Sequence, residues 1–326
     1  MLFWCQRLCF LLTFFLFLTG PVDTCFAATY DVAADFSTVS NPNGPWSYGW
    51  SSSRGTPLNL YDEAFNIYAY GGQVIGWIAP FAVFGAPDVS FTISDIHHPT
   101  VFLPKDTVAF HPGPNGENSV IRWTAPACGK HNISGNFIGR DFYYPTTTDV
   151  AVLHEQTEIF SSNINSYNIP IPFSIDLNIL SGETIDFTVG FGIDGNFSGD
   201  STGIAAEIKS LYSFSGSGEG FQQPVILDRP FKLGSTIPVK FVITDGCGGE
   251  VKGASATLKV KKLTNETPDG DTINAISNVS DQGNTFRYDG SQYIYNLATN
   301  YLSVGRWRLI VTFDNGQIET IDVGIK

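Results

Sequence analysis

Three aromatic residues at alternating positions, Trp46, Tyr48 and Trp50, form the first group in this sequence that could contact a ligand. Side chains two residues apart on a strand project to the same face, and exposed indole and phenol rings can stack on sugar rings. Trp77 and Trp123 are further indoles that could join such a surface. The alternative is that these rings fill a hydrophobic core, which is the commoner place for Trp.

A second group is the segment from Asp194 to Asp200, which has an oxygen-bearing side chain at every second position. The side chains are those of Asp194, Asn196, Ser198 and Asp200. Calcium is bound by about six to eight oxygen ligands, and a loop of this kind can supply part of that set. The closing Glu of an EF-hand loop is missing, so a plain Asp-Gly turn is the alternative. We expect no cofactor other than calcium.

Patterns that would indicate an enzyme are weak in this chain. Hydrolysis of a glycan needs two carboxyl groups beside the bond, one of them with a raised pKa, and the spacing of the acidic residues selects no such pair. No GxSxG motif stands out, and the five histidines show no His-x-His or HExxH spacing. We therefore expect a protein that is not an enzyme and has no catalytic residues.

The composition favours strands and narrows the range of partners. Charged residues make up only 15% of the chain, whereas aromatic residues make up 14% and Gly occurs 33 times, which suits pleated strands joined by tight turns. The net charge is -13, and no cluster of Lys and Arg interrupts the acidity. Nucleic acids and anionic membrane surfaces are therefore excluded as expected partners.

The N-terminus has the layout of a secretory signal peptide. Arg7 precedes an apolar run from Leu8 to Leu18, and Gly20-Pro21 follows as a breaker. The run is shorter than the roughly 20 apolar residues that a membrane span needs. Cleavage after Ala27 would remove residues 1–27, and we expect no transmembrane anchor afterwards. The sequence thus predicts a protein that is secreted or lies on the extracellular side of the cell envelope.

Cys128 and Cys247 are the two cysteines that remain after removal of the signal peptide. They lie in different predicted domains, so a disulfide between them would clamp the domains together. Two isolated thiols are the alternative, which the sequence does not exclude. Neither cysteine belongs to a CxxC or Cys/His cluster, so we expect no zinc site.

Short β-type runs separated by Gly, Pro, Asn and Asp fill the chain from Tyr30 to about Ser210. This punctuation predicts a jelly-roll-like β-sandwich over residues 28–212. Residues 213–220 (SFSGSGEG) are rich in Ser and Gly, which is typical of a flexible linker. The β pattern resumes over residues 221–326, and roughly a hundred residues in about seven strands is the size of an immunoglobulin-like β-sandwich.

The second domain carries the run Gly234-Ser235-Thr236-Ile237-Pro238-Val239-Lys240-Phe241. This run, with Phe221-Gln222-Gln223-Pro224-Val225 upstream and Gly305-Arg306-Trp307-Arg308-Leu309 downstream, resembles the PxKF domain of secreted bacterial proteins. The resemblance covers essentially all of residues 221–326. It implies a structural β-sandwich module without catalytic residues. Phe241, Trp307 and Leu309 are expected core residues, and Asp314-Asn315-Gly316 an expected hairpin turn.

The first domain opens with Asp35-Phe36-Ser37 and Asn41-Pro42-Asn43-Gly44-Pro45-Trp46. With the later run Ser119-Val120-Ile121-Arg122-Trp123, it is similar to a jelly-roll-like module of exported bacterial proteins, often ones with C-terminal sorting signals. The resemblance implies a sandwich like that of carbohydrate-binding modules, which is an analogy of fold.

Together these observations predict an exported binding or surface-architecture protein whose jelly-roll domain binds a glycan or another surface component. A secreted glycan-active hydrolase is the alternative from another class, and a purely structural cell-surface protein is the third. An exposed aromatic strip or a calcium-ready loop would indicate binding, and a cleft with paired acids of shifted pKa would indicate an enzyme.

Overall fold

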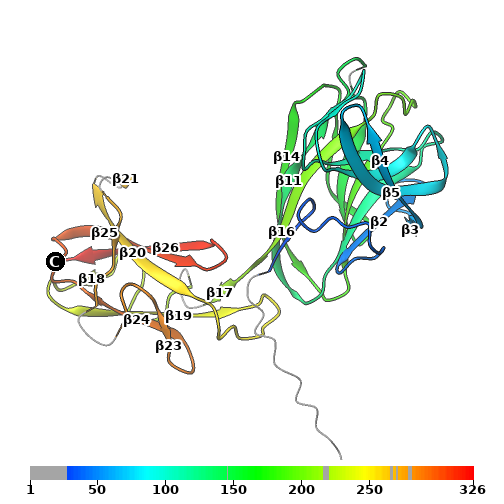
Figure 1. Cartoon of the computed structure of the whole chain (residues 1–326). Helices are drawn as coiled ribbons and strands as arrows, with labels where there is room; N and C mark the ends of the chain where they lie inside the picture. The colour runs from blue at the N-terminus through cyan, green and yellow to red at the C-terminus, as the bar shows by residue number, and fades with distance from the viewer. Residues whose placement is uncertain (1–27, 145, 216–219, 265–266, 269–270, 278–280) are drawn as a thin grey trace, which may run out of the picture.

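The computed structural model describes residues 28–144, 146–215, 220–264, 267–268, 271–277 and 281–326. The predicted signal peptide, residues 1–27, lies outside the described residues. Figure 1 shows two lobes built from β-strands. The described residues include no helix, and hence none long and apolar enough to cross a membrane. The predicted all-β fold class is confirmed.

The first lobe is a sandwich of two antiparallel sheets. The strands of the large sheet are β1 (Thr29–Asp31), β4 (Glu63–Ala69), β5 (Gly72–Val83), β6 (Ala86–Thr92), β9 (Val108–His111), β11 (Gly129–Gly139), β14 (Pro170–Ile179) and β16 (Thr202–Leu211). Those of the small sheet are β2 (Trp46–Ser51), β3 (Asn59–Leu60), β10 (Asn118–Thr124), β12 (Asp149–His154), β13 (Thr157–Asn163) and β15 (Thr184–Gly190). A separate pair is formed by β7 (Ile96–His97) and β8 (Phe102–Leu103).

The strand orders place the central strands of each sheet opposite one another. The large sheet runs β14-β11-β16-β9-β6-β5-β4, with β1 paired to β16, and the small sheet runs β13-β12-β15-β10-β2-β3. Alternation along β10 sends Ile121 and Trp123 into the core, where they join Phe110 of the large sheet. Arg122 points to the other face and its Nε lies 2.6 Å from Oδ1 of Asp186. The core therefore fixes which side chains of the small sheet face outward.

Strand register brings several strand ends together at one end of this sandwich. Asn118 at the start of β10 lies opposite Ser51 at the end of β2, and Asp149 at the start of β12 lies opposite Gly190 at the end of β15. We call this the free end, because the other end, where β11 begins and β16 finishes, meets the second lobe (Figure 1). The loops that follow β2, β9, β11 and β15 leave from the free end.

The second lobe packs a four-stranded sheet against a six-stranded one. The first contains β17 (Ser213–Ser215), β19 (Thr236–Thr244), β23 (Arg287–Tyr288) and β24 (Tyr293–Ala298). The second contains β18 (Pro230–Phe231), β20 (Ala256–Thr264), β21 (Thr267–Pro268), β22 (Ile273–Asn274), β25 (Gly305–Phe313) and β26 (Ile318–Ile325). The expected core residues Phe241, Trp307 and Leu309 are buried, and Asp314-Asn315-Gly316 joins β25 to β26 as expected.

The junction between the lobes differs from the predicted flexible linker at residues 213–220. Ser213–Ser215 is strand β17, which pairs with β19, and Phe214 packs against Phe241 and Phe313. Tyr212 is already part of the second core. The first lobe therefore passes into the second between Leu211 and Tyr212. The contacts of the Phe214 ring stabilise a strand here, although the Ser and Gly residues around it favour a loop. Residues 216–219 lie outside the described residues.

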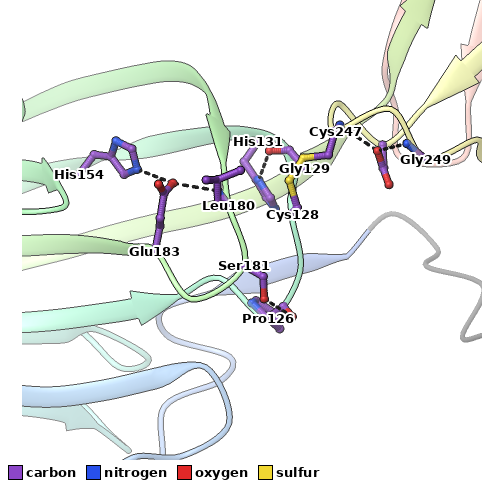
Figure 2. Close-up of a disulfide and its surroundings, with 11 residues drawn as sticks. Pro126, Cys128, Gly129, His131, His154, Leu180, Ser181, Glu183, Cys247 and Gly249 are labelled. Carbon is purple, nitrogen blue, oxygen red and sulfur yellow. Dashed lines mark hydrogen bonds and ion pairs between the residues drawn. A yellow bond between two sulfur atoms is a disulfide. The ribbon is translucent and has the colours of Figure 1, made fainter.

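A disulfide joins Cys128, just before β11, to Cys247, in the loop after β19 (Figure 2). Of the two alternatives that the sequence leaves open, the structure shows the interdomain clamp. The loop that carries Cys247 is itself ordered by Asp245, whose Oδ1 accepts hydrogen bonds from the backbone N–H groups of Cys247 and Gly249. The backbone N–H of Lys130 also donates to the Asp245 carbonyl oxygen at 3.0 Å, beside the disulfide.

Candidate functional site

A cleft of about 550 Å³ opens at the free end of the first sandwich. Its walls come from the loops after β2 and β15 and from the facing ends of β10, β12 and β13. It is lined by Ser53, Arg54, Gly116, Asn118, Asp149, Ser161, Ser162, Asn163, Gly190, Phe191, Gly192 and Ile193. We call it the free-end cleft. Hydroxyl, amide and guanidinium groups line it together with the Phe191 ring, so it offers both hydrogen bonds and an apolar surface.

Arg54 ties the loop after β2 to two strands of the small sheet. Its Nη2 pairs with the carboxylate of Asp149, and its Nη1 lies 2.7 Å from Oε2 of Glu158. Asp149 is fixed further by the backbone N–H of Gly192, which donates to its Oδ1 at 2.8 Å. The hydroxyl of Ser161, followed by the Arg54 guanidinium, lowers the pKa of Glu158. Both carboxylates therefore serve to hold Arg54 in place.

Two polar atoms of the free-end cleft are buried without a hydrogen-bond partner among the described residues. They are Oδ1 of Asn118, an acceptor, and Nε of Arg54, a donor. Asn118 is only 5% exposed, and its Nδ2 donates weakly to the Gly116 carbonyl at 3.4 Å. Leaving such groups unsatisfied costs about 1–3 kcal/mol each, so a ligand that satisfied them would be favoured. Neither atom is exposed, so the side chains around them must shift before a ligand reaches them.

Gly190 keeps the floor of the cleft open. A Cβ at this position would lie 2.5 Å from Oδ1 of Asp149 and 2.9 Å from Oδ1 of Asn118. Any side chain here would displace both acceptors, because a Cβ contact under 3 Å is not tolerated. The small residue therefore lets two acceptor oxygens converge at the end of β15.

The predicted aromatic strip is corrected by the structure, because its rings belong to the core. Trp46, Tyr48 and Trp123 are at most 1% exposed, and Trp77 is 6% exposed. Trp50 is half-buried and packs edge-on against Phe81. The alternation rule correctly places Trp46, Tyr48 and Trp50 on one side of β2, but this side faces the large sheet. The four buried rings therefore stabilise the sandwich and are not available to stack on a sugar, whereas Trp50 keeps part of its surface exposed.

Two of the buried indoles have internal hydrogen-bond partners, whereas Nε1 of Trp123 has none among the described residues. Nε1 of Trp46 donates to Oδ2 of Asp35 at 3.1 Å, and Nε1 of Trp77 donates to the carbonyl oxygen of Ser37 at 2.8 Å. Buried Trp usually finds such partners. These bonds secure the segment before β2 against the core.

The predicted calcium ligands lie in the loop after β15, next to the free-end cleft. Asp194 and Asp200 meet at the Thr147 hydroxyl, with their oxygens 3.0 and 3.1 Å from its Oγ1. Asn196 and Ser198 instead form consecutive turns, in which Oδ1 of Asn196 accepts from the Ser198 N–H. No group of three or more His, Cys, Asp or Glu side chains in the described part of the chain is placed to hold a metal ion. Calcium binding by this loop stays a prediction.

Asp200 is the most buried carboxylate of this loop, with no exposed surface. Its Oδ1 accepts hydrogen bonds from the N–H and hydroxyl of Thr147, whereas its Oδ2 has no partner among the described residues. Burial, which outweighs these hydrogen bonds, raises the pKa of Asp200 to about 7. The carboxyl group is therefore sensitive to pH near neutrality, yet it is not accessible to a ligand.

The sequence gives little signal for the residues of the cleft. Arg54 is separated from Asp149 by 95 residues and from Glu158 by 104, and Asn118 lies in another loop-to-strand junction. No local spacing connects them. The only available signal is that Asn118 and Asp149 stand at the ends of strands, where loops carry binding residues.

Comparison with known proteins gives a fold-level likeness and no family. No protein-family model and no curated protein matches the chain. Similar solved structures include the CBM51 module of Clostridium perfringens GH95 in complex with methyl-galactose, with 10% identity, TM-score 0.28, and 56% of this chain and 99% of that chain covered. They also include a family 35 carbohydrate binding module from Clostridium thermocellum, with 11% identity, TM-score 0.23, and 56% and 96% covered.

Enzymes occur among the similar structures as well. A GH2 beta-galacturonidase from Eisenbergiella tayi, bound to galacturonate, shares 10% identity at TM-score 0.21, with 71% of this chain and 40% of that chain covered. These likenesses concern β-sandwich folds and assign no ligand or activity to this chain. The resemblances to a PxKF domain and to a sorting-signal-type module stay predictions.

Proposed function

We propose that this chain is an exported, non-enzymatic protein whose first lobe binds a neutral glycan in the free-end cleft. One observation carries the proposal. The cleft contains an unsatisfied acceptor, Oδ1 of Asn118, and an unsatisfied donor, Nε of Arg54. A hydroxyl group both donates and accepts, so sugar hydroxyls suit both atoms. Because neither atom is exposed, binding requires the side chains around them to shift.

The charges and size of the cleft favour a neutral sugar. Arg54 is already matched by the carboxylates of Asp149 and Glu158, and the whole chain has a net charge of -13. An anionic ligand would therefore meet repulsion. The volume of about 550 Å³ lies within the range of small-ligand sites. Phe191 adds an aromatic ring that suits the apolar face of a pyranose.

The carboxylates near the cleft do not suit glycoside hydrolysis. A general acid needs a raised pKa and contact with the bond that is cleaved. The pKa of Glu158 is lowered, so this carboxylate stays ionised. Asp200 has a raised pKa, but it is fully buried and does not line the free-end cleft. This contrast supports a binding role over the alternative of a hydrolase.

Export is supported by the disulfide as well as by the predicted signal peptide. Disulfides such as Cys128–Cys247 form and persist mainly in oxidising compartments outside the cytosol. The second lobe, clamped to the first by this bond, would then act as a spacer or display module. A purely structural surface role remains the alternative, and it would leave the free-end cleft without a ligand.

A glycan array tests the proposal. Mature protein, residues 28–326, is compared with Asn118→Ala, which removes the unsatisfied acceptor, and with Asn178→Ala as a matched control. Asn178 lies in β14 opposite Lys130, at the far end of the sandwich. We expect neutral glycans to bind the mature protein and Asn178→Ala, and to be lost from folded Asn118→Ala. Equal binding by all three proteins, or by none, would contradict the proposal.

A further inference from the structure

Four aromatic rings lie on the surface of the free end, beside the cleft. They are Phe142, Tyr143, Tyr144 and Tyr167, which are 46%, 65%, 60% and 38% exposed. They form two edge-to-face pairs, with ring centroids 4.7 Å apart for Tyr143 and Tyr144 and 5.9 Å apart for Phe142 and Tyr167. We call these four residues the aromatic platform. Such pairs leave other ring faces open to solvent, so the platform offers several surfaces for stacking.

The backbone beneath the platform is held in place. Asp141 is 2% exposed, and its Oδ1 accepts hydrogen bonds from the N–H groups of Tyr143 and Tyr144 at 3.2 and 3.0 Å. The N–H of Phe142 donates to the Thr100 carbonyl oxygen at 2.8 Å. A buried carboxylate thus presents exposed rings from an anchored turn. Exposing large rings in this way costs solvation free energy, which a bound partner would recover.

The aromatic platform is continuous with the free-end cleft through the loop after β15. At the cleft end of this loop, a Cβ on Gly192 would overlap the carbonyl of Thr147. At the platform end, a Cβ on Gly199 would lie 3.1 Å from Cβ of Tyr144. The loop therefore packs closely on the segment that carries the tyrosines. A ligand that leaves the cleft along this loop meets the platform next.

We infer that the aromatic platform is an extended subsite that stacks the further pyranose rings of an oligosaccharide whose terminal sugar lies in the free-end cleft. This inference rests on the proposed function. Tyrosine suits the role because its ring stacks on the apolar face of a sugar while its hydroxyl bonds to water or to sugar hydroxyls. The loop between cleft and platform adds exposed polar groups from Asn196 and Ser198. The ligand class is thus a neutral oligosaccharide rather than a monosaccharide.

Calorimetric titration with ladders of cello-, chito- and galacto-oligosaccharides, from monosaccharide to hexasaccharide, tests the inference. The proteins are mature wild type, the double variant Tyr143→Ala/Tyr144→Ala, and the control Tyr68→Ala. Tyr68 is 76% exposed but lies on β4, at the edge of the large sheet. Circular dichroism and thermal melting confirm that each variant is folded.

In the ladder that binds, we expect wild-type affinity to rise with chain length. The double variant should bind the hexasaccharide about tenfold or more weakly, as expected for the loss of ring contacts, and should bind the monosaccharide as wild type does. Tyr68→Ala should match wild type throughout. Monosaccharide binding that does not strengthen with chain length, or an equal loss of affinity in Tyr68→Ala, would contradict the role of the aromatic platform and leave the proposed function of the cleft intact. No binding of any ladder would contradict the proposed function, and the platform with it.

Discussion

Cys128 and Cys247 are joined by a disulfide across the two lobes, with their Cα atoms 6.2 Å apart and a sequence separation of 119 residues. The lobes are therefore connected at a second point, besides the chain that passes from Leu211 to Tyr212. Asn315 of the second lobe reinforces the junction, because its Nδ2 donates to the carbonyl oxygen of Ser210 in β16 at 3.2 Å. Two covalent connections therefore restrict the motion of the second lobe relative to the first.

Loss of the disulfide should loosen the junction without unfolding either sandwich. We expect Cys128→Ser/Cys247→Ser to lower the free energy of unfolding by about 2–4 kcal/mol, because a long loop of the unfolded chain is no longer closed. Thermal melting and small-angle X-ray scattering measure stability and shape. Identical melting temperatures and scattering curves for the oxidised, reduced and double-variant proteins would show that the disulfide does not hold the two lobes together.

The buried carboxyl of Asp200 should make the protein less stable as the pH rises. Its folded-state pKa is raised to about 7, above the roughly 3.9 of an unfolded Asp. Between about pH 4 and 7 the folded state keeps a proton that the unfolded state has lost, so stability falls across this window. Asp200→Asn cannot ionise, and its stability relative to wild type should grow across the window, by as much as about 4 kcal/mol.

Urea unfolding at a series of pH values measures this effect. Asp106→Asn is the control, because Asp106 is exposed and its φ of 61° suits Asn as well as Asp. Its pH dependence should follow that of wild type. Burial also raises the pKa of Asp88 to about 8, so a smaller decline should persist in Asp200→Asn. A variant with the same pH profile as wild type would show that Asp200 is not protonated in the folded protein.

Removing Trp123 should cost stability rather than binding. The ring is fully buried, with the rings of Tyr30 and His131 each 5.3 Å away. We expect Trp123→Ala to lower the free energy of unfolding by about 3–5 kcal/mol, as is usual for a large core ring. Exposed Tyr68→Ala should stay within about 0.5 kcal/mol of wild type. Denaturant titration would contradict the core assignment if the two variants were equally stable.

Replacing Arg54 by Lys separates its charge from its hydrogen-bond geometry. Lys keeps a cation between Asp149 and Glu158 but has no atom equivalent to the unsatisfied Nε. We expect Arg54→Lys to melt within a few degrees of wild type and to bind its glycan about tenfold more weakly. Calorimetry measures the affinity. Wild-type affinity in this variant would mean that Nε makes no contact with the ligand.

Strand-level features of this fold could be predicted from the sequence, because they depend on local patterns. The runs 149–154 and 184–190 are alternating or β-branched segments bounded by turn residues, and they form β12 and β15. The alternation of Trp46 and Tyr48 also shows that they share a face. It cannot show which face is covered, since Val120 and Ala151 on the outward side of the small sheet are buried as well.

The cleft could not be predicted, because it depends on contacts between distant segments. Arg54 meets Asp149 only after the small sheet has assembled, and no spacing in the sequence signals this contact. The linker prediction is wrong at residues 213–215 for a related reason. The many Ser and Gly residues in this segment indicate a loop. Phe214 instead belongs to a strand, because its ring packs against Phe221 and against Phe241 of β19.

Amide chemical shifts recorded during a glycan titration test the central claim most directly. The titration uses isotopically labelled mature protein and a neutral sugar that binds on the array. Binding in the free-end cleft should shift the backbone amides of Gly116, Asn118 and Gly192, and leave those of the β4–β5 hairpin, including Gly71, unchanged. Saturable shifts confined to that hairpin or to the second lobe, with a silent free end, would contradict the account.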